Sequence, residues 1–66
     1  MRLWLDKETD ALYLRLDESE VVETEEVSPG VMLDYNESNE VVGVEILRLS
    51  ERSSGKNFTA PQLEVV

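Results

Sequence analysis

The sequence contains no cysteine and no histidine among its 66 residues. Disulfide bridges are therefore excluded, as are the usual zinc sites and the catalytic centres that depend on a thiol or an imidazole. No apolar run approaches the roughly 18 residues that a membrane-spanning helix needs, and the first residues do not form a secretion signal. We expect a cytoplasmic protein whose folded part is one domain.

The small size of the chain also limits how it can be stabilised. A chain of this length buries only about 60% of its unfolded surface and is marginally stable by itself. Without disulfides or zinc, the remaining supports are an efficient core and self-association. The sequence therefore predicts a homo-oligomer, most simply a homodimer.

Basic residues are scarce and unevenly placed. Six Lys and Arg stand against fifteen Asp and Glu, which gives a net charge of −9, and no basic residue lies between Leu16 and Leu47, where ten carboxylates occur. Such a surface repels phosphate backbones, so we expect no nucleic-acid binding. It would attract a basic protein surface, although solubility and protection of exposed edge strands explain the same charge.

Apolar and polar residues alternate in two pairs of segments, which predicts two β-hairpins. In the first hairpin, residues 2–5 and 11–16 flank the polar turn 6–10, and pairing Leu5 with Leu12 places Leu3 beside Leu14 on one face.

The second hairpin joins residues 31–35 to residues 42–46 through the loop 36–39. Pairing Tyr35 with Glu40 would place Leu33 opposite Val42. The same register would place Val31 opposite Val44.

Between the hairpins, residues 21–27 read as a further strand that lies at an edge or with one face in water, because it is rich in charge. Whether Glu23 and Glu25 face the core or the solvent stays open. Pro29 and Gly30 end this strand. Residues 47–52 could form a short helical turn.

The predicted fold is mainly β, α+β at most: an antiparallel five-strand meander with a short helical turn near residues 47–52. Residues 1–52 form the β-rich domain, and residues 53–66 form a flexible linker and tail, with pairing to a neighbouring subunit as an alternative. The predicted core consists of Leu3, Leu5, Leu12, Leu14, Leu16, Val31, Leu33, Val42, Val44 and Ile46.

Four blocks of the sequence resemble a known family. Residues 6–13 (DKETDALY), 21–27, 29–35 and 42–47 are similar, in order and spacing, to domain of unknown function twenty-two eighty-three, a family of small and mostly prokaryotic proteins. One departure is Asn39, where the family commonly has glycine; asparagine also tolerates the left-handed conformation. The resemblance implies a β-rich fold and no established activity. Members sometimes sit beside small toxin-like genes, which favours a binding or antidote-like role.

The sequence offers little machinery for catalysis. It contains no thiol or imidazole nucleophile, and its serines have no neighbouring base, so we expect no enzyme and no cofactor. One alternative is a carboxylate site, metal-binding or acid/base, built from Asp6, Glu8 and Asp10 with the pair Glu23 and Glu25. Turn capping and a solvated strand face are the simpler explanations of these carboxylates.

A partner-binding surface is the other hypothesis. Trp4, Tyr13, Met32 and Val41 are expected on the sheet face opposite the main apolar set, where they would mark a surface for self-association or for another protein. The residues predicted to bind a partner are Trp4, Tyr13 and Met32, together with Glu23 and Glu25. The sequence as a whole favours a non-catalytic protein-binding module that acts on a basic partner.

Overall fold

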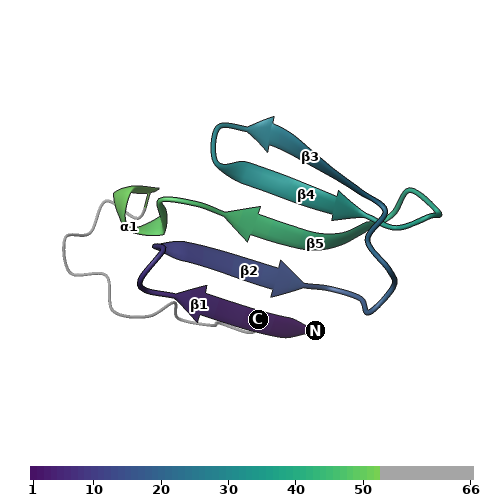
Figure 1. The fold of residues 1–66 in the computed structure, drawn as a ribbon, viewed down its shortest axis with the longest axis horizontal. Coiled ribbons are helices and arrows are strands. Elements are labelled where there is room, and N and C mark those ends of the chain that lie inside the picture. Colours follow the sequence, from purple (N-terminus) through teal and green to yellow (C-terminus); the bar gives the residue numbers. More distant parts are fainter. Residues whose placement is uncertain (53–66) are drawn as a thin grey trace, which may run out of the picture.

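A computed structural model describes residues 1–52, which form one five-stranded antiparallel sheet and a short helix (Figure 1). The elements are β1 (Arg2–Asp6), β2 (Ala11–Arg15), β3 (Glu23–Ser28), β4 (Val31–Tyr35), β5 (Val41–Ile46) and α1 (Leu49–Arg52). The mainly β fold and the helical turn predicted near residues 47–52 are confirmed. The predicted linker and tail lie outside the described residues. Within residues 1–52, no helix is long and apolar enough to cross a membrane.

The strands are arranged in the order β1-β2-β5-β4-β3. Consecutive strands pair within the hairpin β1–β2 and within the meander β3–β4–β5, and these two pieces join where β2 pairs with β5. The chain therefore passes from β2 to the far edge of the sheet before it returns inward. The order follows composition: the sequence VVGVEI of β5 suits the central position, whereas the charged β3 tolerates an edge.

The first hairpin has the register that the sequence predicts. Leu3 pairs with Leu14 and Leu5 pairs with Leu12. The turn between the strands is closed by the Asp6 side chain, whose Oδ1 accepts hydrogen bonds from the backbone N–H groups of Glu8 and Thr9, at 3.0 and 3.4 Å. This is the turn chemistry expected of an aspartate at such a position.

The predicted register of the second hairpin is wrong by two residues. Leu33 pairs with Val44, and not with Val42. The difference arises beside the loop, where Tyr35 pairs with Val41 and a β-bulge separates this pair from the pair Asp34–Gly43. The cause lies in the loop: the backbone N–H of Asn36 donates to the Glu40 carbonyl, so that Glu40 belongs to the loop and is not opposite Tyr35. Since the shift is two residues, the facing of the alternating residues is preserved.

Asn36 is the residue that holds this loop. Its Oδ1 accepts hydrogen bonds from the backbone N–H groups of Ser38 and Glu40, at 3.0 and 2.9 Å, and its Nδ2 donates to Glu40 Oε1 at 2.9 Å. The residue as a whole is only 9% exposed. Asn39 has φ 62°, so asparagine does adopt the left-handed conformation in this turn.

The sheet has two faces of opposite character. Residues paired directly across antiparallel strands share a face, so the register defines both sets. The apolar face consists of Leu3, Leu5, Leu12, Leu14, Val31, Leu33, Val44 and Ile46, with Tyr35, Glu23 and Glu25 toward the β3 margin. The polar face consists of Arg2, Trp4, Tyr13, Arg15, Thr24, Glu26, Met32, Asp34, Gly43 and Glu45.

Burial on the apolar face is incomplete. Val42 is the one buried hydrophobic residue in the described part of the chain, at 2% exposure, while Leu3 is 50% exposed. The other predicted core residues are half-buried, except Leu16, which is exposed. Figure 1 shows the reason: α1 lies beyond the ends of the strands, so that residues 1–52 form a single layer.

Candidate functional site

A chain of hydrogen bonds crosses the polar face. Asp34 on β4 accepts a hydrogen bond from the Thr24 hydroxyl on β3 through Oδ1, at 2.7 Å, and from the Tyr13 hydroxyl on β2 through Oδ2, at 2.7 Å. The Asp34 carboxylate therefore links β3, at the edge of the sheet, to β2, which lies beyond β5. Alternation places all three side chains on this face, since Asp34 lies between Leu33 and Tyr35.

The strand between β2 and β4 is β5, and it carries Gly43 under the Tyr13–Asp34 hydrogen bond. A Cβ atom at this position would lie 2.6 Å from the Tyr13 hydroxyl oxygen and 2.7 Å from Asp34 Oδ2, closer than atoms approach without displacement. Glycine inside a strand often marks such a close approach. Here it leaves the space through which the tyrosine reaches the aspartate.

Arg15 extends the network to the connection between β2 and β3. It donates from Nη1 to the Tyr13 hydroxyl at 3.2 Å, from Nε to the Asp17 carbonyl at 2.6 Å, and from Nη2 to the Ser19 carbonyl. Asp17 in turn accepts hydrogen bonds from the Ser19 hydroxyl and backbone N–H, and these lower the pKa of its carboxyl. The guanidinium thus holds the start of the long connection to β3.

The electrostatics of the network keep Tyr13 protonated. Burial raises the pKa of the Tyr13 hydroxyl above its ordinary value of 10.0; the hydrogen bond to Asp34 adds to the increase, and the bond from Arg15 opposes it. The Tyr13 hydrogen bond in turn raises the pKa of Arg15. A neutral phenol between a carboxylate and a guanidinium is a hydrogen-bond donor and acceptor, and it is a poor nucleophile or base at neutral pH.

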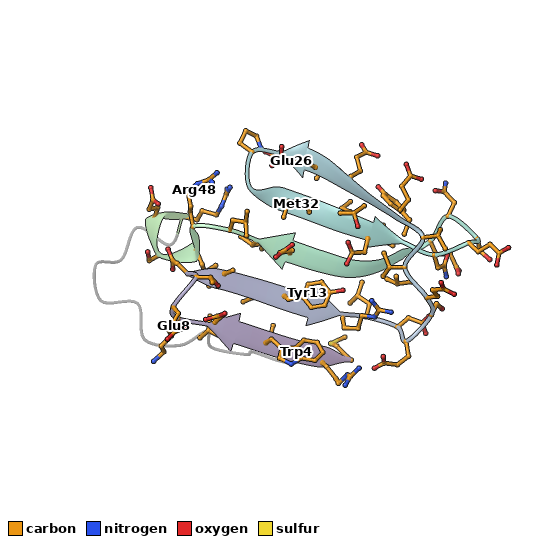
Figure 2. All side chains as sticks on the ribbon, viewed as in Figure 1. Trp4, Glu8, Tyr13, Glu26, Met32 and Arg48 are labelled. Atoms are coloured by element: carbon orange, nitrogen blue, oxygen red, sulfur yellow. The ribbon has the colours of Figure 1, made fainter. Side chains whose placement is uncertain are left out.

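Three of the predicted partner-binding residues lie on this face. Trp4 and Tyr13 are neighbours on β1 and β2 (Figure 2), with ring centroids 5.7 Å apart. The Arg2 guanidinium lies over the Trp4 ring, 4.9 Å from the ring centroid. Met32 is in the same row of the sheet, with Glu45 between it and Tyr13. Trp4 is 45% exposed. The aromatic pair is therefore accessible at one margin of the polar face.

The other two predicted residues, Glu23 and Glu25, lie on the opposite face. Glu25 pairs with Leu33 and Glu23 pairs with Tyr35, so both carboxylates belong to the margin of the apolar face. The structure does not bring them to Trp4, Tyr13 and Met32. All six residues of β3 are exposed, and together they form the edge of the sheet farthest from β1.

The carboxylates of the alternative site are engaged separately. Asp6 caps its own turn, while Asp10 accepts hydrogen bonds from the Ser50 backbone N–H and hydroxyl, at 3.0 and 2.7 Å, and so anchors α1 to the β1–β2 turn. Asp6, Asp10, Lys7 and Ser50 line an open depression beside this turn. Over residues 1–52, no three acidic side chains gather closely enough to hold a metal ion.

Sequence reasoning did not find the network itself. Arg15, Thr24, Asp34 and Gly43 were not among the predicted site residues, although one signal was present. Gly43 interrupts a valine-rich strand, and an isolated glycine there points to a side chain that crosses it closely. The partner of that glycine, Tyr13, lies thirty positions earlier and could be assigned only once β2 was known to pair with β5.

Comparison with known proteins gives a family without an activity. The model of the family described as "Protein of unknown function (DUF2283)" matches residues 2–50. The chain belongs to this family. No curated protein and no solved structure matches it. The resemblance noted in the four sequence blocks is thereby confirmed, and any function has to be argued from the surfaces described above.

Proposed function

We propose that this DUF2283 protein is a non-catalytic binding module that recognises a basic, extended segment of a partner protein along β3. The observation that carries the proposal is the character of this strand. It is six residues long, exposed throughout, acidic, and at the edge of the sheet.

The backbone of an edge strand supports such binding. One side of β3 pairs with β4 and the other pairs with no strand of residues 1–52. Its outward N–H and C=O groups can therefore pair with an added strand, which is a recurring mode of peptide recognition. The backbone bonds would supply affinity and the side chains specificity.

The side chains of β3 favour a basic partner. Glu23 and Glu25 lie on one face of the strand and Glu26 on the other, so an added strand meets a carboxylate on either side. In the described part of the chain the one ion pair joins Arg2 and Glu18, at 2.8 Å, and the β3 carboxylates have no cationic partner. Lys and Arg of a partner would supply those cations and would be steered by the net charge of −9.

A non-catalytic role fits the polar face as well. The polar atoms of Tyr13, Asp34 and Thr24 are directed at one another on an open surface, and a catalytic site requires groups that converge on a substrate in a cavity. The network braces β2, β4 and β3. It thereby holds the edge strand to the rest of the sheet.

The test is a titration with an eight-residue peptide of alternating lysine and valine, in which binding is monitored by the backbone amide NMR shifts of the protein. We expect saturable shifts concentrated in β3 and β4, and none with a peptide in which glutamate replaces lysine. The double variant Glu23→Gln/Glu25→Gln should weaken binding several-fold. The matched control Glu8→Gln/Glu51→Gln makes the same change in net charge at the other end of the sheet and should bind nearly normally.

Two results would contradict the proposal. Equal weakening by both double variants would mean that only net charge matters. Saturable shifts centred on Trp4 and Tyr13 would move the binding surface to the polar face.

A further inference from the structure

The apolar face is the least finished part of the molecule. Stable domains are built from at least two packed layers, because a sheet with one apolar face must bury it against another element. Residues 1–52 supply one layer, with α1 beyond its end (Figure 1). Leu3 is half exposed, and among the described hydrophobic residues Val42 alone is buried. The apolar face therefore requires a second layer packed against it. The polar face does not, because its side chains form a network of hydrogen bonds.

We propose that the apolar face packs against the same face of a second copy of the chain, forming a two-layer β-sandwich dimer. Five strands about 4.8 Å apart and about 17 Å long present about 400 Å² in plan. Two copies then bury about 800 Å² in plan, to which the relief of the side chains adds, and this area is in the range of weak, reversible interfaces. A second copy also has the same width and twist, as the aligned packing of two sheets requires.

The charges at the margins select one arrangement of the two copies. One row of paired residues crosses all five strands of the apolar face: Leu3, Leu14, Val44, Leu33 and Glu25. Val44, on the central strand, lies in the middle of the row. At the β1 margin the row ends in a leucine, and at the β3 margin it ends in a carboxylate.

Two twofold axes could relate the copies face to face. An axis across the strands places β3 over the other β3, and it brings Glu23 and Glu25 of both copies together. Like charges in close contact are unfavourable. An axis parallel to the strands places β3 over the other copy's β1, which brings only Leu3 and Leu5 to this face. The geometry therefore points to an axis that runs along the strands above Val44.

This arrangement defines the contacts of the central row. Val44 faces the partner subunit's Val44, Leu14 faces the partner subunit's Leu33, and Leu3 faces the partner subunit's Glu25. The polar face and the outer backbone edge of β3 remain outside the interface. Glu25 belongs both to this interface and to the proposed recognition of a basic segment. Val44 and the outer backbone edge of β3 do not overlap, so cross-linking at Val44 and the peptide titration can fail separately.

The absence of cysteine makes the arrangement directly testable, since a single introduced thiol is unique in the chain. Facing sheets lie about 10 Å apart, too far for a disulfide, so a short bis-maleimide is the suitable cross-linker. Val44→Cys should be cross-linked to a covalent dimer in high yield. Its neighbour Glu45→Cys, on the polar face of the same strand, is the matched control and should remain largely monomeric on a denaturing gel.

Orientation is read from two further single variants at exposed positions, Leu3→Cys and Glu25→Cys. A mixture of the two should give several-fold more covalent dimer than either variant alone. Strong cross-linking of Leu3→Cys with itself would overturn the proposed axis. A Val44→Cys yield no higher than that of Glu45→Cys would overturn the dimer, and the face would then have another cover.

Discussion

The two faces of this sheet are stabilised in different ways. On the polar face, Tyr13, Asp34 and Thr24 form hydrogen bonds within the chain, and Gly43 leaves room for them. On the apolar face, the described residues meet no second layer, and Leu3 remains half exposed. The polar face should thus govern the stability of the single chain, and the apolar face should govern its association. Substitutions that affect one property and not the other test this division.

The largest effect on stability is expected from Gly43→Ala. The new Cβ would lie 2.6 Å from the Tyr13 hydroxyl oxygen and 2.7 Å from Asp34 Oδ2, so the hydrogen bond must break or the strands must shift. Overpacking of this kind costs roughly 1–3 kcal/mol. Urea unfolding at fixed protein concentration measures the loss. Glu45→Ala, on the same strand and face, is the control, and an equal loss there would show that Gly43 has no special role.

A smaller loss is expected from Asp34→Asn. Asparagine keeps one acceptor oxygen where the carboxylate has two, so one charge-assisted hydrogen bond becomes neutral and the other breaks or reverses its direction, which should cost about 1–2 kcal/mol. Glu45→Gln removes the same charge from the same face and should be nearly neutral, since no hydrogen bond of Glu45 is lost. A double-mutant cycle with Tyr13→Phe isolates the coupling. Additive losses would contradict the network.

The pH dependence of the polar face follows from Tyr13. Folding raises the pKa of its hydroxyl above 10.0, so the folded chain keeps the proton at a pH where the unfolded chain has lost it. The stabilisation from Tyr13 is therefore complete below about pH 10 and decreases as the pH rises through the folded pKa. Absorbance of tyrosinate should show one of the two tyrosines titrating late. Tyr13→Phe should remove that late phase, and retention of the phase would contradict its assignment to Tyr13.

The smallest effect concerns the acidic edge. Ten carboxylates between Leu16 and Leu47 lie without a basic residue in the same stretch, and salt screens their repulsion over about 8 Å at physiological ionic strength. Moderate sodium chloride should therefore raise the melting temperature slightly, and Glu23→Gln/Glu25→Gln should reduce this dependence. A decrease in melting temperature with salt would mean that ion pairs such as Arg2–Glu18 outweigh the repulsion.

The sequence was sufficient to predict the strands and the register of the first hairpin, because apolar alternation and the residue preferences of turns are local properties. Leu3–Leu14 and Leu5–Leu12 followed from the polar turn between them. It was insufficient for the second hairpin, where the side chain of Asn36 closes a longer loop and a bulge absorbs the extra residue. Side-chain hydrogen bonds in a loop can therefore set the register of a hairpin. The alternation of apolar and polar residues cannot distinguish registers that differ by two residues, because both keep the same side chains on the same face.

The candidate site was predicted in part, for a related reason. Trp4, Tyr13 and Met32 were correctly assigned to one face by their alternation with apolar neighbours. The assignment of Val41 to the same face was wrong, because the bulge places Val41 opposite Tyr35 on the apolar face. The Tyr13–Asp34 hydrogen bond depends on the pairing of β2 with β5, which are separated by two strands in the chain. No local pattern encodes that pairing. Glu23 and Glu25 had an ambiguous facing in the sequence, and their register with β4 resolved it.

Sedimentation equilibrium of the full chain tests most directly the claim that the polar face governs stability and the apolar face governs association. The chain mass is 7.5 kDa, and across micromolar concentrations the apparent mass should rise toward twice that value. Leu14→Glu, next to Val44 on the apolar face, should hold the mass at that of a monomer, while Asp34→Asn should leave the association unchanged despite its lower stability. A wild-type mass of 7.5 kDa at every concentration would contradict the account.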